Sequence, residues 1–144
     1  MRYLGIDPGR RRVGLAISDP GGTFASPLVV LRRRSADQVA SEIAAICRRE
    51  TVEALVVGLP LNMDGTKGSA AREAELLAAK VGEATGLAVR MWDERLSSVS
   101  AERSLIEADM SRQRRRRTID KVAAQIILQS FLDAEGSAGD TGTA

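Results

Sequence analysis

Ala54-Leu55-Val56-Val57-Gly58 is an unbroken run of residues without a polar side chain. A strand with one face toward water alternates apolar and polar residues, whereas a continuous apolar run is typical of a strand buried on both faces. Such a strand needs helices above and below its sheet. The run therefore predicts an interior strand of an α/β sheet.

Helical patterns flank this strand on both sides. Ser35-Ala36-Asp37-Gln38 fits a helix capping box, and it is followed at helical spacing by Val39, Ile43, Ile46 and Cys47. A second helix is predicted over residues 70–84, with Thr85-Gly86 as its end signal, and residues 87–92 form another strand. A helix between two strands favours a parallel crossover, so these two strands are predicted to be parallel.

Three short apolar runs precede the first helix, at residues 3–6, 13–18 and 27–31. Asp7-Pro8-Gly9 and Asp19-Pro20-Gly21-Gly22 separate them as turn signals. Short strands joined by tight turns predict an antiparallel meander. Together with the later strands, the pattern predicts an α/β fold: a five-stranded mixed sheet, with a three-strand meander plus two parallel strands and helices on both faces.

The C-terminal third is predicted to be helical with one polar interruption. We expect a helix from Ser98 to Ala108, an Arg-rich connector at 109–117, and a last helix from Thr118 to Asp133. The remaining residues are small and polar, which predicts a disordered tail. The chain is thus expected to form one domain, residues 1–133, with a tail at 134–144.

Composition excludes several classes of site. The sequence has no histidine and one cysteine, Cys47, so histidine metal ligands, Ser-His-Asp triads and cysteine zinc sites are ruled out. Aromatic residues make up 3%, which argues against a stacking platform for single strands. No apolar run approaches the roughly 18 residues of a membrane helix, and no signal peptide is evident. We therefore expect a cytoplasmic protein with no membrane partner.

Charge is distributed unevenly along the chain. Residues 1–34 carry seven arginines and two aspartates, and the segment from 112 to 144 is also basic, whereas the middle is acidic. Basic blocks at both ends favour a polyanionic partner such as nucleic acid. An arginine-rich solvated surface is the alternative, and charge alone does not separate the two.

Carboxylates occur at positions where the predicted fold brings segments together. Asp7 follows the first strand, and Asp93-Glu94 follows the fifth, at the strand ends where open α/β sheets bind ligands. Asp120 lies in the first turn of the predicted last helix. Turn formation, a local ion pair and the helix dipole are the respective structural alternatives. If the last helix packs on the sheet, Asp7, Glu94 and Asp120 converge at one rim.

Converging carboxylates would repel one another unless a cation neutralised them. Mg²⁺ prefers hard oxygen ligands and leaves positions for water and phosphate oxygens. Two such ions could activate water and stabilise the leaving oxygen of a phosphodiester. Without histidine, metal-assisted hydrolysis is the chemistry that this residue set favours.

Arginines accompany the predicted rim. Arginine clamps phosphate groups in a bidentate manner, so these side chains are candidates for binding nucleic acid. A solvated linker is the alternative for the C-terminal run, and an ion pair with Asp93 or Glu94 is the alternative for Arg95. The candidates are Arg10, Arg11, Arg12, Arg95, Arg112, Arg114, Arg115, Arg116 and Arg117.

Four motifs resemble one known family. They are the segment from Asp7-Pro8-Gly9 to Asp19, the loop Val56-Val57-Gly58-Leu59-Pro60-Leu61-Asn62-Met63-Asp64-Gly65, the segment Trp92-Asp93-Glu94-Arg95-Leu96-Ser97, and the helix that starts Asp120-Lys121-Val122-Ala123-Ala124. In order and spacing they are similar to the YqgF (RuvX) family over about residues 1–133. One departure is that Pro8-Gly9-Arg10-Arg11 replaces the family's common Leu-Gly-Thr-Lys, so no threonine is available for a phosphate contact there.

The resemblance implies an RNase H-like fold and a nuclease that processes the 5′ end of pre-16S rRNA with Mg²⁺ or Mn²⁺. It carries the catalytic and metal-binding roles onto Asp7, Glu94 and Asp120. Asp93 is the alternative to Glu94, and we choose Glu94 for its longer reach. Resolution of Holliday junctions in branched DNA is the related activity, and it would call for a homodimer with two active sites.

Two further functions compete with a nuclease. A nucleotide-using phosphotransferase shares the sheet order and an early Asp-x-Gly turn, but such enzymes usually enclose ATP between two domains. A non-catalytic RNA-binding factor in ribosome assembly would use the arginines and would not need three carboxylates. Metal-dependent cleavage separates the nuclease from the RNA-binding factor.

Overall fold

The structure, a computed structural model, describes residues 1–99 and 112–143, and within the last helix it describes the side chains of residue 119 and residues 122–136. Nearly all of the helix predicted from Ser98 to Ala108 lies outside the described residues. Among the helices that are described, none is long and apolar enough to span a membrane.

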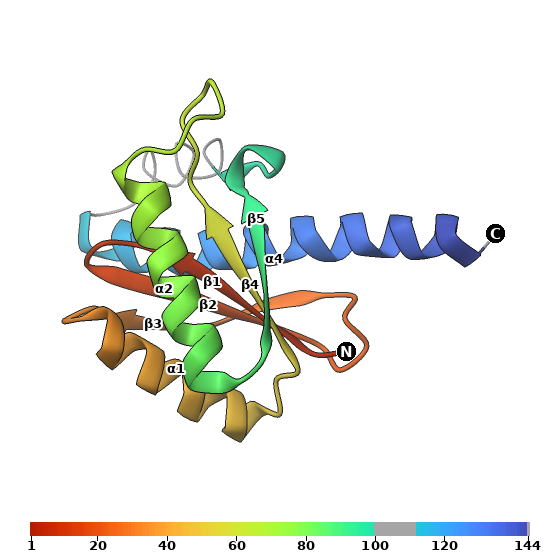
Figure 1. The fold of residues 1–144 in the computed structure, drawn as a ribbon, viewed down its shortest axis with the longest axis horizontal. Coiled ribbons are helices and arrows are strands. Elements are labelled where there is room, and N and C mark those ends of the chain that lie inside the picture. Colours follow the sequence, from red (N-terminus) through yellow and green to blue (C-terminus); the bar gives the residue numbers. More distant parts are fainter. Residues whose placement is uncertain (100–111, 144) are drawn as a thin grey trace.

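Five strands form one mixed sheet in the order β3-β2-β1-β4-β5 (Figure 1). The meander consists of β1 (Tyr3–Pro8), β2 (Arg12–Ser18) and β3 (Ala25–Arg32), each pair antiparallel. β4 (Ala54–Leu59) lies parallel to both β1 and β5 (Ala88–Asp93). The predicted sheet is confirmed, and the continuous apolar run forms a strand whose residues 54–58 are all buried.

Helices α1 (Ala36–Glu50) and α2 (Ser69–Thr85) cover one face of the sheet. The predicted capping box is present: the Ser35 side chain accepts from the backbone N–H of Gln38, and the Gln38 side chain accepts from the backbone N–H of Ser35. Between these helices and the sheet lies an aliphatic core that includes Leu4, Ile6 and Val57. Residues 4 and 6 of β1 therefore point toward α1 and α2.

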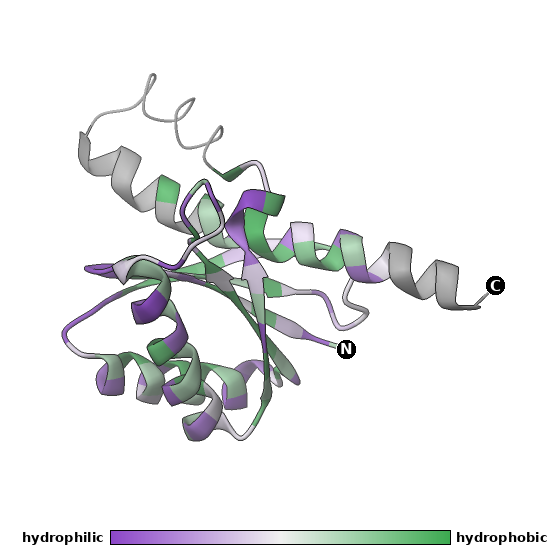
Figure 2. Ribbon diagram, turned by 45° about the horizontal axis from the view of Figure 1, so that its top comes forward, coloured by the Kyte–Doolittle hydropathy of each residue, from purple (hydrophilic) through white to green (hydrophobic). Residues whose placement is uncertain are grey.

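Helix α4 (Arg112–Thr143) covers the opposite face of the sheet. Apolar residues run along its described middle (Figure 2), and they pack with Ala16 and Val56 in a second core. The closest approach is at Gly5 of β1, where an added Cβ would come within 2.7 Å of Leu128 Cβ. Residues 3 and 5 of β1 therefore face α4, as strand alternation requires.

The bounds of α4 correct two expectations. The segment 112–117 was expected to be a connector, but it forms the first turns of α4, because arginine has a high helix propensity and no proline or glycine interrupts it. Asp120 consequently lies well inside the helix rather than in its first turn. The helix also continues to Thr143 instead of ending by Asp133. The division into a domain at 1–133 and a tail at 134–144 stays a prediction.

Candidate active site

The carboxyl ends of three parallel strands meet at one edge of the sheet. Ile6 of β1 pairs with Val57 of β4, and Gly58 of β4 pairs with Trp92 of β5. The next residue of β1 is Asp7, and the residues that follow Trp92 are Asp93 and Glu94. The fold thus brings the ends of β1 and β5 to the two sides of Gly58.

Asp7 is a buried acidic side chain, with 6% of its surface exposed. It lies two residues beyond Gly5, and alternate residues of a strand share a face, so Asp7 is on the α4 face of the sheet. On the other side of β1, its Cα pairs with that of Gly14 in β2. Aspartate is seldom buried in a protein interior, which makes Asp7 a candidate for a functional role.

Glu94 lies on the same face, over β4. It begins the short 3₁₀ helix η1 (Glu94–Leu96) directly after β5. A Cβ added at Gly58 would come within 3.3 Å of Glu94 Cγ and 3.4 Å of Glu94 Cδ. The same added atom would lie 2.9 Å from Ile127 Cδ1 of α4. The absence of a side chain at Gly58 therefore leaves the space that Glu94 occupies between β4 and α4.

Asp93 is engaged by Arg95 instead. The Arg95 guanidinium donates from Nη2 to Asp93 Oδ2 at 2.8 Å and from Nε to both carboxylate oxygens at 3.1 Å. The backbone N–H of Arg95 also donates to Asp93 Oδ1 at 2.9 Å, which caps η1. These hydrogen bonds lower the pKa of the Asp93 carboxyl. Asp93 is therefore committed to Arg95, and Glu94 is the acidic residue of this pair that lies beside Gly58.

Asp120 is placed only through its backbone in α4, because its side chain is outside the described part of the helix. Position 120 precedes Ala124 by four residues, and residues four apart share a face of a helix. Ala124 is buried, and its carbonyl oxygen lies 3.3 Å from the position of an added Gly5 Cβ. Among the side chains that are described, no group of three acidic or cysteine residues is arranged to hold a metal ion. The three-carboxylate site therefore stays a prediction.

The predicted nucleic-acid-binding arginines differ in their surroundings. Arg10 turns toward α2, where its Nη2 donates to Ser69 Oγ at 2.9 Å and its Nε lies 3.6 Å from Glu73 Oε2. Arg11 is exposed and Arg12 is half-buried. Arg95 is held by Asp93. The side chains of Arg112, Arg114, Arg115, Arg116 and Arg117 fall outside the described set.

Arg95 also fastens the loop that follows β4, a role not predicted from the sequence. Its Nη1 donates to the backbone carbonyl of Met63 at 3.4 Å. Gly65 lies beside the guanidinium with φ of +86°, a left-handed conformation that favours glycine. Backbone hydrogen bonds between Asn62 and both Thr66 and Gly65 close the loop. We call this loop, residues 60–68 between β4 and α2, the braced loop. Met63 lies on it and is 94% exposed.

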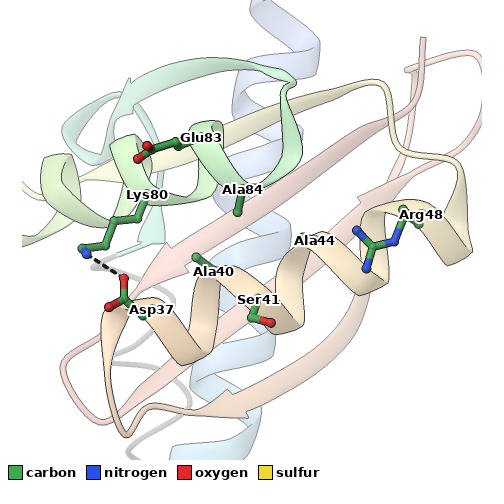
Figure 3. Close-up of a pocket in the computed structure, with 8 residues that line it drawn as sticks. All are labelled: Asp37, Ala40, Ser41, Ala44, Arg48, Lys80, Glu83 and Ala84. Carbon is green, nitrogen blue, oxygen red and sulfur yellow. Dashed lines mark hydrogen bonds and ion pairs between the residues drawn. The ribbon is translucent and has the colours of Figure 1, made fainter.

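A groove of the described surface lies away from this edge of the sheet. It runs between α1 and α2, and its lining includes the ion pair between Lys80 Nζ and Asp37 Oδ1 at 2.6 Å (Figure 3). Small residues, including Ala40 and Ala44, form its floor (Figure 3). These helices cover the sheet face opposite α4, so the groove is separate from Asp7 and Glu94. The candidate site is an open edge of the sheet.

Comparison with known proteins gives consistent matches over nearly the whole chain. A family model described as "RuvX: Holliday junction resolvase" matches residues 1–134. A protein of Syntrophomonas wolfei subsp. wolfei, named "Putative pre-16S rRNA nuclease", is 48% identical over 96% of this chain and 98% of its own length. A protein of the same name from Gluconacetobacter diazotrophicus is 51% identical over 92% of this chain and 87% of its own.

Solved structures match in fold. RuvC of Thermus thermophilus, in complex with a Holliday junction substrate, superposes with a TM-score of 0.61 at 16% identity, covering 95% of this chain and 96% of that one. A second structure of Thermus thermophilus RuvC gives a TM-score of 0.56 at 18% identity. At this level of identity the likeness concerns the fold alone. The RNase H-like fold predicted from the sequence is confirmed.

Proposed function

The chain belongs to the RuvX family, as its sequence motifs indicated, and from this membership we propose that it is a metal-dependent endonuclease acting on the precursor of 16S rRNA in the cytoplasm. Relatives that cover nearly the whole chain at 41–51% identity carry the name of such a nuclease. Hydrolysis of a phosphodiester without histidine requires another means of activating water, which a carboxylate-bound metal ion provides.

The observation that carries the proposal is the shared position of Asp7 and Glu94 on the α4 face, on either side of Gly58. The packing of α4 supports Asp120 as the third member. Phe131 lies against Tyr3, with ring centroids 5.2 Å apart, and Ala124 and Leu128 lie against Gly5. As α4 is followed toward its start, its contacts move along β1 toward the carboxyl end. One further turn brings position 120 toward Asp7.

The donor set fits a hard divalent cation. Asp7, Glu94 and Asp120 offer only carboxylate oxygens, the ligands that Mg²⁺ and Mn²⁺ prefer. When bound, the ion supplies Lewis acidity toward a phosphate oxygen and lowers the pKa of a water molecule. The chain's own contribution is positioning. Asp7 is held by β1 in the interior, and the Asp93–Arg95 pair fixes the backbone from which Glu94 extends.

The test compares Asp7→Asn, Glu94→Gln and Asp120→Asn with the matched control Asp133→Asn, an exposed aspartate of α4. Each of the first three is expected to reduce cleavage of a pre-16S rRNA fragment by about 100-fold or more, because a metal ion contributes several kcal/mol to such a transition state. Electron paramagnetic resonance of bound Mn²⁺ gives an independent readout of binding. Full cleavage in EDTA, or unchanged activity in all three variants, would overturn the proposal.

A second candidate is resolution of branched DNA, which the family description and the RuvC-like fold favour. A Holliday junction must be cut on two strands, so this activity calls for a homodimer. Competition between a four-way DNA junction and precursor rRNA for cleavage discriminates the two substrates. Sedimentation on the junction tests the dimer. If the protein binds RNA equally well in EDTA and in Mg²⁺ and never cuts it, the protein is instead a non-catalytic assembly factor. Binding of ATP, measured by calorimetry, would favour a phosphotransferase.

A further inference from the structure

A cluster of arginines lies beyond Asp7, built from two segments that are distant in sequence. Arg11 precedes β2 and Arg12 begins it, whereas Arg32 ends β3 and Arg34 lies two residues beyond it; we call these four residues the β2–β3 arginine patch. The β1–β2 turn and the end of β3 lie side by side in both ribbon views (Figures 1 and 2). The backbone N–H of Arg33 donates to the carbonyl of Arg11 at 2.8 Å, which joins the two segments.

The patch places like charges opposite each other. Arg12 and Arg32 are direct partners in the β2–β3 pairing. Residues that face each other across two antiparallel strands lie on the same face of the sheet, so the Arg12 and Arg32 side chains leave the sheet on one side.

Three of the four guanidinium groups have no acidic partner in the part of the chain that the structure describes. No described carboxylate lies within 4.0 Å of the guanidinium groups of Arg11, Arg32 and Arg34. The printed hydrogen bonds of Arg32 and Arg34 use their backbone atoms, which contact the Gln38 side chain. By contrast, Arg10, Arg49, Arg90 and Arg95 are each paired with a carboxylate.

Arg33 has a different task within the same segment. Its Nη1 donates to the carbonyl of Gly9 at 3.2 Å, so it fastens the β1–β2 turn to the end of β3. This turn follows Asp7 directly. The backbone segments that carry Arg11, Arg32 and Arg34 are therefore held at a fixed place relative to the proposed active site.

We propose that the β2–β3 arginine patch binds the phosphate backbone of the nucleic-acid substrate on one side of the cleavage position. The inference rests on the proposed function. β3 lies two strand spacings, about 10 Å, from β1. Successive base pairs are about 3.4 Å apart, so the patch engages phosphates about three steps from the reacting one. The substrate crosses the sheet edge from the Glu94 side toward β3.

The test uses Arg32→Gln together with Arg34→Gln. Neither substitution removes a contact to Gln38, because these contacts use the backbone atoms of residues 32 and 34. The matched control is Arg48→Gln together with Arg49→Gln. It removes the same charge from the far end of α1, roughly 22 Å away for a helix of this length. Binding of a fluorescein-labelled RNA hairpin with single-stranded arms is measured by anisotropy in EDTA over a series of KCl concentrations. The same series is run with a four-way DNA junction.

Loss of two phosphate contacts is expected to reduce the slope of log K against log [KCl] by about 1.4 to 1.8 for the patch variant, and by far less for the control. An unchanged slope, an equal loss in the control, or no binding by the wild-type protein overturns the inference. A reduced slope without any cleavage in Mn²⁺ would support the patch while rejecting the nuclease.

Discussion

At the scale of single residues, Gly58 decides whether Glu94 can lie between β4 and α4. We expect Gly58→Ala to reduce nuclease activity strongly, because its methyl group would come within 2.9 Å of Ile127 Cδ1 and 3.3 Å of Glu94 Cγ. Adding Ile127→Val removes the closer of these contacts and should recover much of the stability without restoring activity. Recovery of both in the double variant, measured by urea unfolding and by cleavage rate, would show that packing alone is affected.

Cys47 gives a pH-dependent prediction. Burial raises the pKa of its thiol from 9.0 to about 11. A raised folded-state pKa contributes stability that is present below pH 9 and is lost as pH rises toward 11. We therefore expect Cys47→Ala to flatten the decline in the free energy of unfolding across this range. In the folded wild type, Ellman's reagent at pH 8 should label the thiol only as the protein unfolds, and rapid native labelling would contradict this.

The choice between Asp93 and Glu94 shows the limit of sequence reasoning at this scale. The sequence favours Glu94 by its reach, and this choice stays a prediction, to which the structure adds two local observations. Asp93 is drawn to Arg95 two residues later, and Gly58 makes room for Glu94 on a neighbouring strand. An ion pair of Asp93 or Glu94 with Arg95 is visible as an alternative in the sequence. The space at Gly58 depends on strand register, which no local pattern specifies.

At the scale of elements, close packing of α4 on β1 depends on Gly5. Gly5→Ala is expected to destabilise the protein by about 1–3 kcal/mol, because the added methyl group would lie 2.7 Å from Leu128 Cβ and the helix must shift. Gly136→Ala is the matched control in α4, since nothing lies within 4 Å of its added Cβ. Urea unfolding measures both. Equal stabilities for the two variants would mean that α4 does not approach β1 this closely.

The braced loop after β4 yields a second prediction for an element. Arg95→Lys keeps the charge but loses the planar fork that engages Asp93 and the Met63 carbonyl. Hydrogen exchange at the amides of Gly65 and Thr66 should accelerate by up to about fivefold, because an exposed ion pair contributes at most ~1 kcal/mol. Amides of β4 should be unaffected. Lys67→Ala, which breaks only the exposed pair with Glu75, serves as the control.

Elements were predictable from sequence where apolar periodicity was strong. The capping box before α1 and the apolar run of β4 predicted both the type and the position of these two elements, because the local sequence pattern decides which of their residues are buried. The predicted start of the last helix, Thr118, was wrong by about two turns, because α4 begins at Arg112. Residues 112–117 have no apolar periodicity that would predict a helix. Their helical state follows from their intrinsic helix propensity and from their continuity with the part of α4 that is buried from Ala123 onward.

At the scale of the molecule, the two faces of the sheet have different tasks. The face under α1 and α2 holds the larger aliphatic core, whereas the α4 face carries Asp7, Glu94 and the segment with Asp120. The arginine patch lies on the β3 side of this edge, and the braced loop lies between β4 and α2. The strand order that creates this arrangement was predictable from the alternation of strands and helices. The predicted convergence of Asp120 with Asp7 and Glu94 depends, in addition, on how α4 packs on the sheet.

Metal binding should therefore be visible in the stability of the whole fold. A ligand that binds only the native state at 100 times its Kd adds about 2.7 kcal/mol, which raises the Tm of a domain of this size by roughly 5–10 °C. We expect Mn²⁺ to produce such a shift in the wild-type protein and in Asp133→Asn, and to produce none in Asp7→Asn. Equal Mn²⁺ shifts in Asp7→Asn and the wild type, measured by differential scanning calorimetry, would place the ion away from Asp7 and reject the shared carboxylate site.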